Sequence, residues 1–380
     1  MEYKDKIFRH NLRKIYRGVL LIVLIAAVAL LMKVQLDNRV YTRYETLEKL
    51  ESVGSENSKF ENCNGNLLCY SMDGISAYDK NGRQLWNQTF QMQSVMVKSA
   101  GDYVVCADYQ GSKVYLIGKN GLICTIDTHL PVLGVTVSAQ GIPVALLQED
   151  ETVYLRMFAQ DGSVIANYRT TMRNFGYPLA YTISPDNIKM GVSFLKAASG
   201  KISTSLAFYN FGGVGQNETD NLVSAYECEE EVVPFFVYPN ENNALAIGSK
   251  KIRLFSGKQK PTLAKEIETD QEINAVFYNR NYFVLVVDSQ MGAGRYELRV
   301  YDMSGNEKLT TSIDFEYTDI VVEDARILVY NQNRLQIISM NGNIAYNGEL
   351  GGSIRRIIPV DNYARFLVVY EDKLERIRLR

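Results

Sequence analysis

The sequence offers few histidines that could form a metal site or a catalytic triad. Of its two histidines, His10 lies in a basic N-terminal stretch, and His129 precedes Pro131 in a segment typical of a loop. A zinc site or a Ser/His/Asp triad would depend on His129 alone, and no Cys-x-x-Cys pair or Gly-x-Ser-x-Gly elbow accompanies it. We therefore expect His129 to be a solvated loop residue, and we predict no metal site, no cofactor and no catalytic residues.

A glycine-rich stretch at 210–218, NFGGVGQNE, raises the question of phosphate binding. Phosphate-binding loops open a helix and end in Gly-Lys-Ser/Thr or in a third spaced glycine. Here a strand-like segment precedes the glycines and the polar run QNETDN follows them. The pattern favours an enlarged hairpin turn, and we expect no nucleotide to bind.

Composition argues against a nucleic-acid partner. The chain carries 41 Lys and Arg against 43 Asp and Glu, a net charge of −2. Residues 37–380 hold 34 of the basic and 41 of the acidic residues, a net charge of −7. A mildly acidic domain offers no basic footprint for DNA or RNA.

The five cysteines are 63, 69, 106, 124 and 228, an odd number in a long chain. Cys63 and Cys69 could bridge adjacent strands, but a core of this size needs no disulfide and we favour buried free thiols.

The first 36 residues predict a membrane anchor. Residues 18–32 carry no charge, and Val34 and Leu36 extend the apolar stretch to 19 positions, close to the length of a membrane helix. Six Lys or Arg residues precede it, so residues 1–17 are expected in the cytoplasm. A cleaved signal peptide is the alternative, because Ala27 and Ala29 have the spacing of a cleavage site. We predict a cytoplasmic tail (1–17), a transmembrane signal anchor (18–36), a connecting segment (37–54) and an extracytoplasmic domain (55–380) at the cell membrane.

Short apolar runs followed by turn signals repeat along the exported part. The turn glycines fall at 82, 121, 162, 212, 257, 305 and 342, at spacings of 37 to 50 residues. Such a period is typical of propeller blades, and each unit reads as four strands. Asn or Asp precedes several of these glycines, as expected for tight hairpins with positive φ before glycine. We predict an all-β, eight-bladed propeller, with seven blades as the alternative.

The last unit, at the C-terminus, lacks an outermost strand. An N-terminal segment must supply it, because an open sheet edge would otherwise remain. The natural donor is within residues 39–52, RVYTRYETLEKLES, although the spacing of Tyr44, Leu47 and Leu50 also fits a helix.

Several stretches carry a family resemblance. The repeated units and ISPDN at 183–187 resemble WD40-like and TolB-like propellers. NGNLLCYSMDGISAYDKNGRQLWNQ, FYNFGGVGQN and LVVYEDKLERIRLR resemble the domain of unknown function 5711, a family of membrane-anchored proteins of Gram-positive bacteria. This resemblance implies an exported propeller and assigns no catalytic residue.

One segment is similar to quinone-dependent dehydrogenases. AYDKNGRQLW carries Asp79, Gly82 and Trp86 but is one residue shorter than their blade signature and lacks its threonine. We expect Trp86, the single tryptophan, to pack between blades rather than against a cofactor.

We therefore predict a non-enzymatic, membrane-tethered propeller that binds or scaffolds an envelope protein or glycan. The alternatives are a lyase or hydrolase with a carboxylate or tyrosine pair in the funnel, and an envelope sensor. Two connections between second and third strands, 196–201 and 288–294, look enlarged, so the binding-surface candidates are Lys196, Lys201, Met291 and Arg295.

Overall fold

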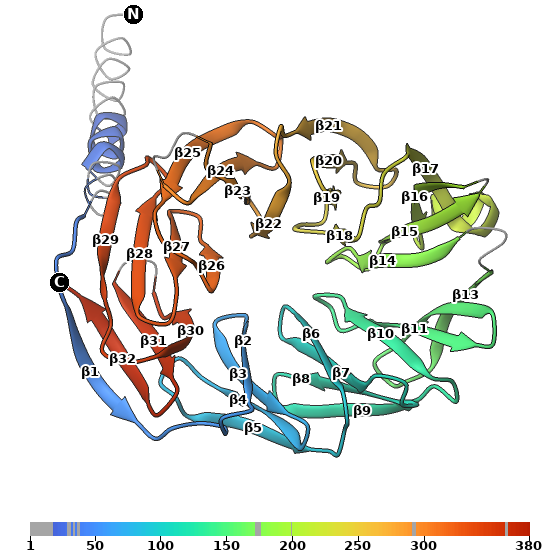
Figure 1. Ribbon diagram of the computed structural model, residues 1–380, viewed down its shortest axis with the longest axis horizontal. Coiled ribbons are helices and arrows are strands. Elements are labelled where there is room, and N and C mark those ends of the chain that lie inside the picture. The colour runs from blue at the N-terminus through green and yellow to red at the C-terminus, as the bar shows by residue number, and fades with distance from the viewer. Residues whose placement is uncertain are drawn as a thin grey trace, which may run out of the picture.

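The computed structural model describes residues 18–28, 32, 35, 39–171, 176–198, 200–290, 294–361 and 364–380. Within this part of the chain, the strands form eight four-stranded antiparallel sheets arranged around a central axis (Figure 1). The prediction of an all-β, eight-bladed propeller is confirmed, and the seven-bladed alternative is wrong.

Each blade is numbered here along the chain, and its first strand lies nearest the axis. Blade 1 comprises β2 (Lys59–Cys63), β3 (Asn66–Ser71), β4 (Gly74–Tyr78) and β5 (Gln84–Thr89), and blade 2 comprises β6 (Val95–Ala100), β7 (Tyr103–Asp108), β8 (Lys113–Gly118) and β9 (Gly121–Asp127). Blade 3 comprises β10 (Val132–Val137), β11 (Pro143–Glu149), β12 (Thr152–Phe158) and β13 (Val164–Thr171), and blade 4 comprises β14 (Tyr177–Ile183), β15 (Lys189–Ala198), β16 (Lys201–Asn210) and β17 (Leu222–Glu229). Blade 5 comprises β18 (Phe235–Val237), β19 (Asn243–Ile247), β20 (Lys251–Ser256) and β21 (Thr262–Glu268), and blade 6 comprises β22 (Ile273–Tyr278), β23 (Tyr282–Asp288), β24 (Tyr296–Asp302) and β25 (Glu307–Ile313). Blade 7 comprises β26 (Asp319–Val322), β27 (Arg326–Tyr330), β28 (Arg334–Ser339) and β29 (Ile344–Glu349), and blade 8 comprises β30 (Ile354–Pro359), β31 (Arg365–Tyr370), β32 (Leu374–Leu379) and, as its fourth strand, β1 (Tyr44–Leu50).

The turns between third and fourth strands share one construction in blades 1, 3, 6 and 7, at Gly82, Gly162, Gly305 and Gly342. In blade 1, the Gly82 N–H donates to the Asp79 carbonyl (2.9 Å), Gly82 has φ of 76°, and the strand pairing shifts by one residue just beyond the turn. This is a type I turn followed by a glycine bulge. Asn81 is not among the residues with positive φ, so the expectation of positive φ before glycine was wrong here: glycine alone adopts it.

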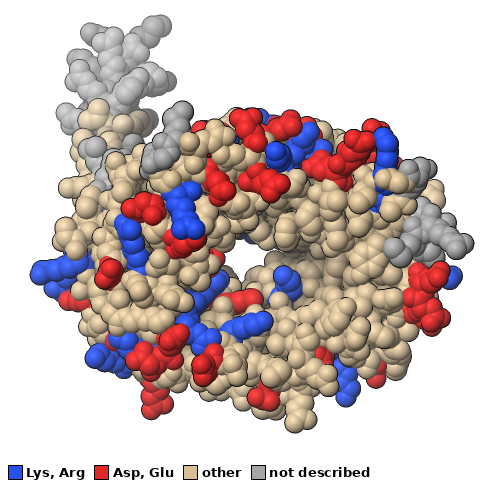
Figure 2. All heavy atoms as spheres, in the orientation of Figure 1, with Lys and Arg blue, Asp and Glu red and all other residues tan. Residues whose placement is uncertain are grey.

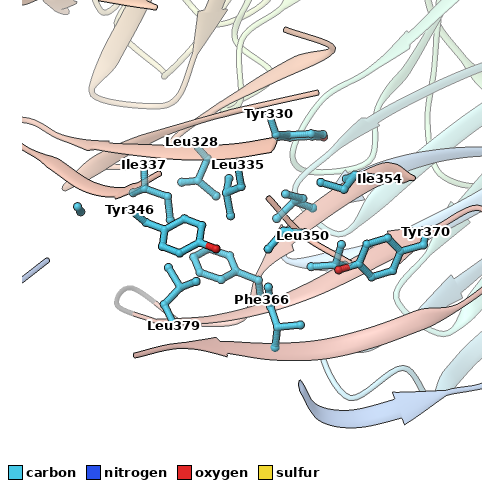
Figure 3. Close-up of a cluster of buried hydrophobic side chains, with 14 residues drawn as sticks. Leu328, Tyr330, Leu335, Ile337, Tyr346, Leu350, Ile354, Phe366, Tyr370 and Leu379 are labelled. Carbon is cyan, nitrogen blue, oxygen red and sulfur yellow. The ribbon is translucent and has the colours of Figure 1, made fainter. Parts of the chain in front are cut away.

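The core lies between blades. The second and third strands are almost wholly buried, and their side chains pack against the neighbouring blade. Figure 3 shows one such cluster, in which Leu335 and Tyr346 of blade 7 meet Phe366 of blade 8. Full burial of one such apolar side chain stabilises the fold by about 1.5–3 kcal/mol. Stability is therefore distributed around the ring.

The two ends of the chain close this ring. β1 pairs antiparallel with β32, from Tyr44 opposite Leu379 to Leu50 opposite Leu374. Ion pairs join Glu48 to Arg376 (2.9 Å) and Glu45 to Arg380 (2.7 Å). The predicted ring-closing strand within 39–52 is confirmed, and the helical interpretation is wrong, because the open edge of β32 offers the segment a full set of backbone partners.

The N-terminal region is described only in part. Residues 18–28 are helical. Among the described residues, no helix has both the length and the apolar character needed to cross a membrane. The predicted cytoplasmic tail, 1–17, lies outside the described residues, as do residues 29–31, 33, 34 and 36 of the predicted anchor, 18–36.

All five cysteines are free, and four of them are buried. Burial raises the pKa of Cys63 to about 11 and that of Cys106 to about 12. A thiol reacts as its thiolate, so these groups are chemically inert in the folded protein. We expect iodoacetamide at pH 8 to modify Cys124 first and the other four only after unfolding in guanidinium, as counted by mass spectrometry. Rapid labelling of Cys106 in the native protein would contradict the packing described here.

Candidate binding site in the central channel

The eight first strands surround a channel whose walls differ in charge. Figure 2 shows the opening at the centre of the ring, with Lys and Arg atoms gathered along one side of it. The first strands of blades 3 to 6, β10, β14, β18 and β22, carry no charged residue. Those of the other four blades carry four cations and two anions, a net charge of +2: Lys59, Lys98, Arg355, Arg356, Glu61 and Asp319.

Two adjacent cavities lie in this channel. One, of about 670 Å³, is lined by first strands of blades 1 to 6 and includes Lys98 and Phe235. The other, of about 470 Å³, lies at the start of β2 and β30 and includes Lys59 and Arg355. Glu61 and Tyr70 line both. Cavities of this size match those that hold small or extended ligands.

The two carboxylates carried by the first strands are already hydrogen-bonded, whereas Glu371, from the turn between β31 and β32, also lines the smaller cavity and forms no ion pair in the described chain. Asp319 accepts hydrogen bonds from Arg356 (2.5 Å) and from the Tyr330 hydroxyl (3.1 Å). Glu61 accepts one from the Tyr70 hydroxyl (2.8 Å). Burial raises the pKa of both tyrosines, so their hydroxyls stay protonated and donate. These bonds fix one wall of the channel.

Three cations of the same wall have no carboxylate partner. Lys59 and Lys98 are exposed, and within the described chain neither forms an ion pair. Arg355 donates to the backbone carbonyls of Ser55 (3.2 Å) and Ser58, and its guanidinium lies 4.8 Å from the ring centre of Phe60. Their charges are therefore available to a ligand.

Aromatic side chains cover the uncharged wall. Phe235 in β18 is 63% exposed, and Tyr278 in β22 is 45% exposed. Both line the larger cavity, together with Tyr181. Neighbouring residues nevertheless desolvate Tyr278 enough to raise its pKa. An exposed phenylalanine facing a cavity is unusual, because burying its ring would be favourable.

Three of the predicted surface residues, Lys196, Lys201 and Arg295, lie elsewhere and do not line either cavity. The stretch 196–201 extends a long hairpin, since Ala198 pairs with Lys201, so the inserted residues lengthen β15 and β16 rather than a loop. Lys196 pairs with Glu227 (2.9 Å) and Lys201 with Glu230 (2.7 Å).

The second predicted stretch, 288–294, is described in part. Arg295 pairs with Glu316 and is more than half exposed. Met291 lies outside the described residues. The structure thus leaves Lys196, Lys201 and Arg295 in separate surface ion pairs.

The other motifs have structural roles. His129 is an exposed residue between β9 and β10, as expected. Gly215 lies in the enlarged turn between β16 and β17, where a Cβ would stand 1.6 Å from the Asn210 carbonyl oxygen. Close backbone packing therefore explains this glycine. Trp86 in β5 packs on the cluster between blades 1 and 2, which confirms the expected packing between blades.

Sequence reasoning overlooked the channel residues because each looks ordinary alone. One signal was available: the predicted first strand of each unit could have been compared for charge. SIRRIIPV and SKFENC would have stood apart from the uncharged first strands of the middle blades.

Fold and channel together define an eight-bladed propeller with a ligand-sized, partly cationic channel. The chain belongs to the family of unknown function DUF5711, whose match extends over residues 37–379. A search of curated proteins found no match.

Solved structures share the architecture at low sequence identity. BamB from Moraxella catarrhalis has a TM-score of 0.50 and 11% identity, and the match covers 89% of this chain and all of BamB. AztD from Citrobacter koseri has a TM-score of 0.54 and 8% identity, covering 78% and 87%. Sqt1 from Saccharomyces cerevisiae has a TM-score of 0.52 and 10% identity, covering 90% and 99%. At these identities the likeness concerns the fold.

Proposed function

We propose that this protein is a non-enzymatic propeller, tethered to the cell membrane and lying outside the cytoplasm, that binds a component of the envelope, protein or glycan, in its channel. The observation that carries the proposal is the pair of solvent-open cavities in which Lys98, and Lys59 with Arg355, form no ion pair with a carboxylate in the described chain. A rigid ring of blades holds these side chains in place, as binding sites require.

Chain topology supports an orientation for the tether. Residues 42 and 43 bond to Arg380, so the chain enters the ring at the face that carries the turns between third and fourth strands. We call this the tether face, and the opposite one the distal face. Exposed aliphatic side chains recur around its rim, near the starts of the fourth strands: Leu85, Leu122, Ile123, Val164, Ile165, Leu222, Leu263 and Ile344. Such a rim suits a face turned toward a bilayer.

An enzyme is the second candidate, because one carboxylate–tyrosine pair, Glu61 with Tyr70, lines both cavities. A second pair, Asp319 with Tyr330, lines neither cavity, and its tyrosine is fully buried. However, a tyrosine acting as a base needs a lowered pKa, and burial raises the pKa of both. The geometry therefore favours binding over proton abstraction.

Site-directed crosslinking in intact cells tests the proposal. In a Cys124→Ser background, which removes the one cysteine that is not buried, Lys98→Cys would carry a membrane-impermeant maleimide photocrosslinker inside the channel, and Lys113→Cys, on an exposed strand start outside both cavities, is the matched control. We expect labelling of both variants and capture of one envelope component by Lys98→Cys only. No labelling of either site would contradict the extracytoplasmic location. Equal capture at both would contradict the channel site, and release of a cleaved ligand would favour the enzyme.

A further inference from the structure

We infer that the channel ligand is an anionic glycan, with carboxylate or phosphate groups on its sugar rings, and that it reaches the channel from the distal face. This inference rests on the proposed function and adds the ligand class and the route. It draws on the charges, the exposed aromatic rings and the position of the smaller cavity.

The charges select an anion. Glu61 and Asp319 are engaged by Tyr70, Tyr330 and Arg356, whereas Lys59, Lys98 and Arg355 form no ion pair with a carboxylate in the described chain. Glu371 also lines the smaller cavity, but the three cations Lys59, Arg355 and Arg356 outnumber the carboxylates there. The domain as a whole is acidic, so this cationic wall is a local exception. A narrow cavity with low-dielectric walls concentrates such a potential.

The uncharged wall of the channel, with its exposed aromatic rings, favours a sugar as the ligand. Phe235 and Tyr278 present exposed rings where no charged residue lies on the neighbouring first strands. A pyranose ring has an apolar C–H face that stacks on an aromatic ring, and acid substituents elsewhere along the same glycan would meet the cationic wall. An acidic peptide would satisfy the lysines but brings no such planar apolar face with each charge.

The smaller cavity marks the route. Its cations, Lys59 and Arg355, stand at the beginning of β2 and β30. First strands begin at the face opposite the turns between third and fourth strands, because consecutive strands are antiparallel. Gln332 and Glu371, from turns between second and third strands, line the same cavity. The cationic mouth therefore opens on the distal face.

Calorimetric titration of the full-length chain in nanodiscs tests the ligand class. The probes are polygalacturonate and phosphate-substituted dextran, with unmodified dextran and polyglutamate as comparisons. We expect both anionic glycans to bind, with affinity falling as NaCl rises, and unmodified dextran not to bind. Polyglutamate should bind at least about tenfold more weakly, since it makes only the ionic contacts.

Paired variants locate the binding. The double variant Lys59→Glu/Lys98→Glu should weaken polygalacturonate binding at least about tenfold, because attraction becomes repulsion at two positions. Lys113→Glu should leave it unchanged. Phe235→Ala should weaken binding severalfold, while Tyr109→Ala, which removes an exposed ring outside both cavities, should not. Circular dichroism melting checks that each variant folds.

The outcomes separate the two proposals. Equal affinity of the double variant and Lys113→Glu would overturn the glycan inference, as would tighter binding of polyglutamate. If Lys98→Cys captures a protein or a neutral glycan in cells while both anionic glycans fail to bind, the channel site stands and the ligand class is wrong.

Discussion

A fragment that begins at Lys59 should melt about 7 °C below one that begins at Asp37. The shorter fragment lacks β1, so the outer edge of β32 loses its backbone partners from Leu374 to Leu379. The ion pairs of Glu45 and Glu48 with Arg380 and Arg376 are lost as well. We expect a loss of about 5 kcal/mol, since each backbone hydrogen bond contributes about 1 kcal/mol and the half-buried Tyr44 and Leu50 add apolar contact.

A synthetic peptide of residues 37–54 provides the control for this experiment. Added in excess to the shorter fragment, it should restore most of the melting temperature, because it can occupy the open edge. A peptide of the same composition in scrambled order should not. Equal melting temperatures of the two fragments would mean that closure by β1 contributes nothing to stability.

Replacement of Arg253 by Leu should destabilise the fold by about 3–5 kcal/mol and lower the melting temperature by roughly 4–7 °C. Arg253 in β20 is 9% exposed and lies 2.7 Å from Glu231 and 3.0 Å from Glu266. Removing its charge leaves the Glu231 carboxylate, whose side chain is 17% exposed, without its cation. Lys251, 3.0 Å from Glu266, still neutralises that residue. The penalty therefore comes chiefly from Glu231.

Two further variants make this prediction specific. Arg280→Leu removes a comparable ion pair, with Glu241, from a side chain that is 63% exposed, and it should cost less than about 1 kcal/mol. The double variant Arg253→Leu/Glu231→Leu should recover most of the lost stability, because no uncompensated carboxylate remains. Urea unfolding curves measure all three. A similar cost for Arg253→Leu and Arg280→Leu would contradict the argument from burial.

The sequence by itself determined the parts of the fold that depend on local patterns. Alternating apolar residues located the strands, and the turn glycines revealed the repeat of the blades. The last repeat unit lacked an outermost strand, which predicted closure by residues 39–52, because an unpaired sheet edge leaves backbone N–H and C=O groups without partners. The apolar, unpaired character of the cysteines also followed from chain length and composition.

Only the tertiary structure decided where the candidate site lies. Lys59, Lys98 and Arg355 are far apart in sequence, and each belongs to a different blade. Closure of the ring brings their strands to one side of a channel, while Phe235 and Tyr278 face it from another. Conversely, Lys196 and Lys201 looked free in the sequence but are paired with Glu227 and Glu230 across strands. Whether a charge is available to a ligand depends on its neighbours in space, and those are set by the closed arrangement of the blades rather than by any local pattern.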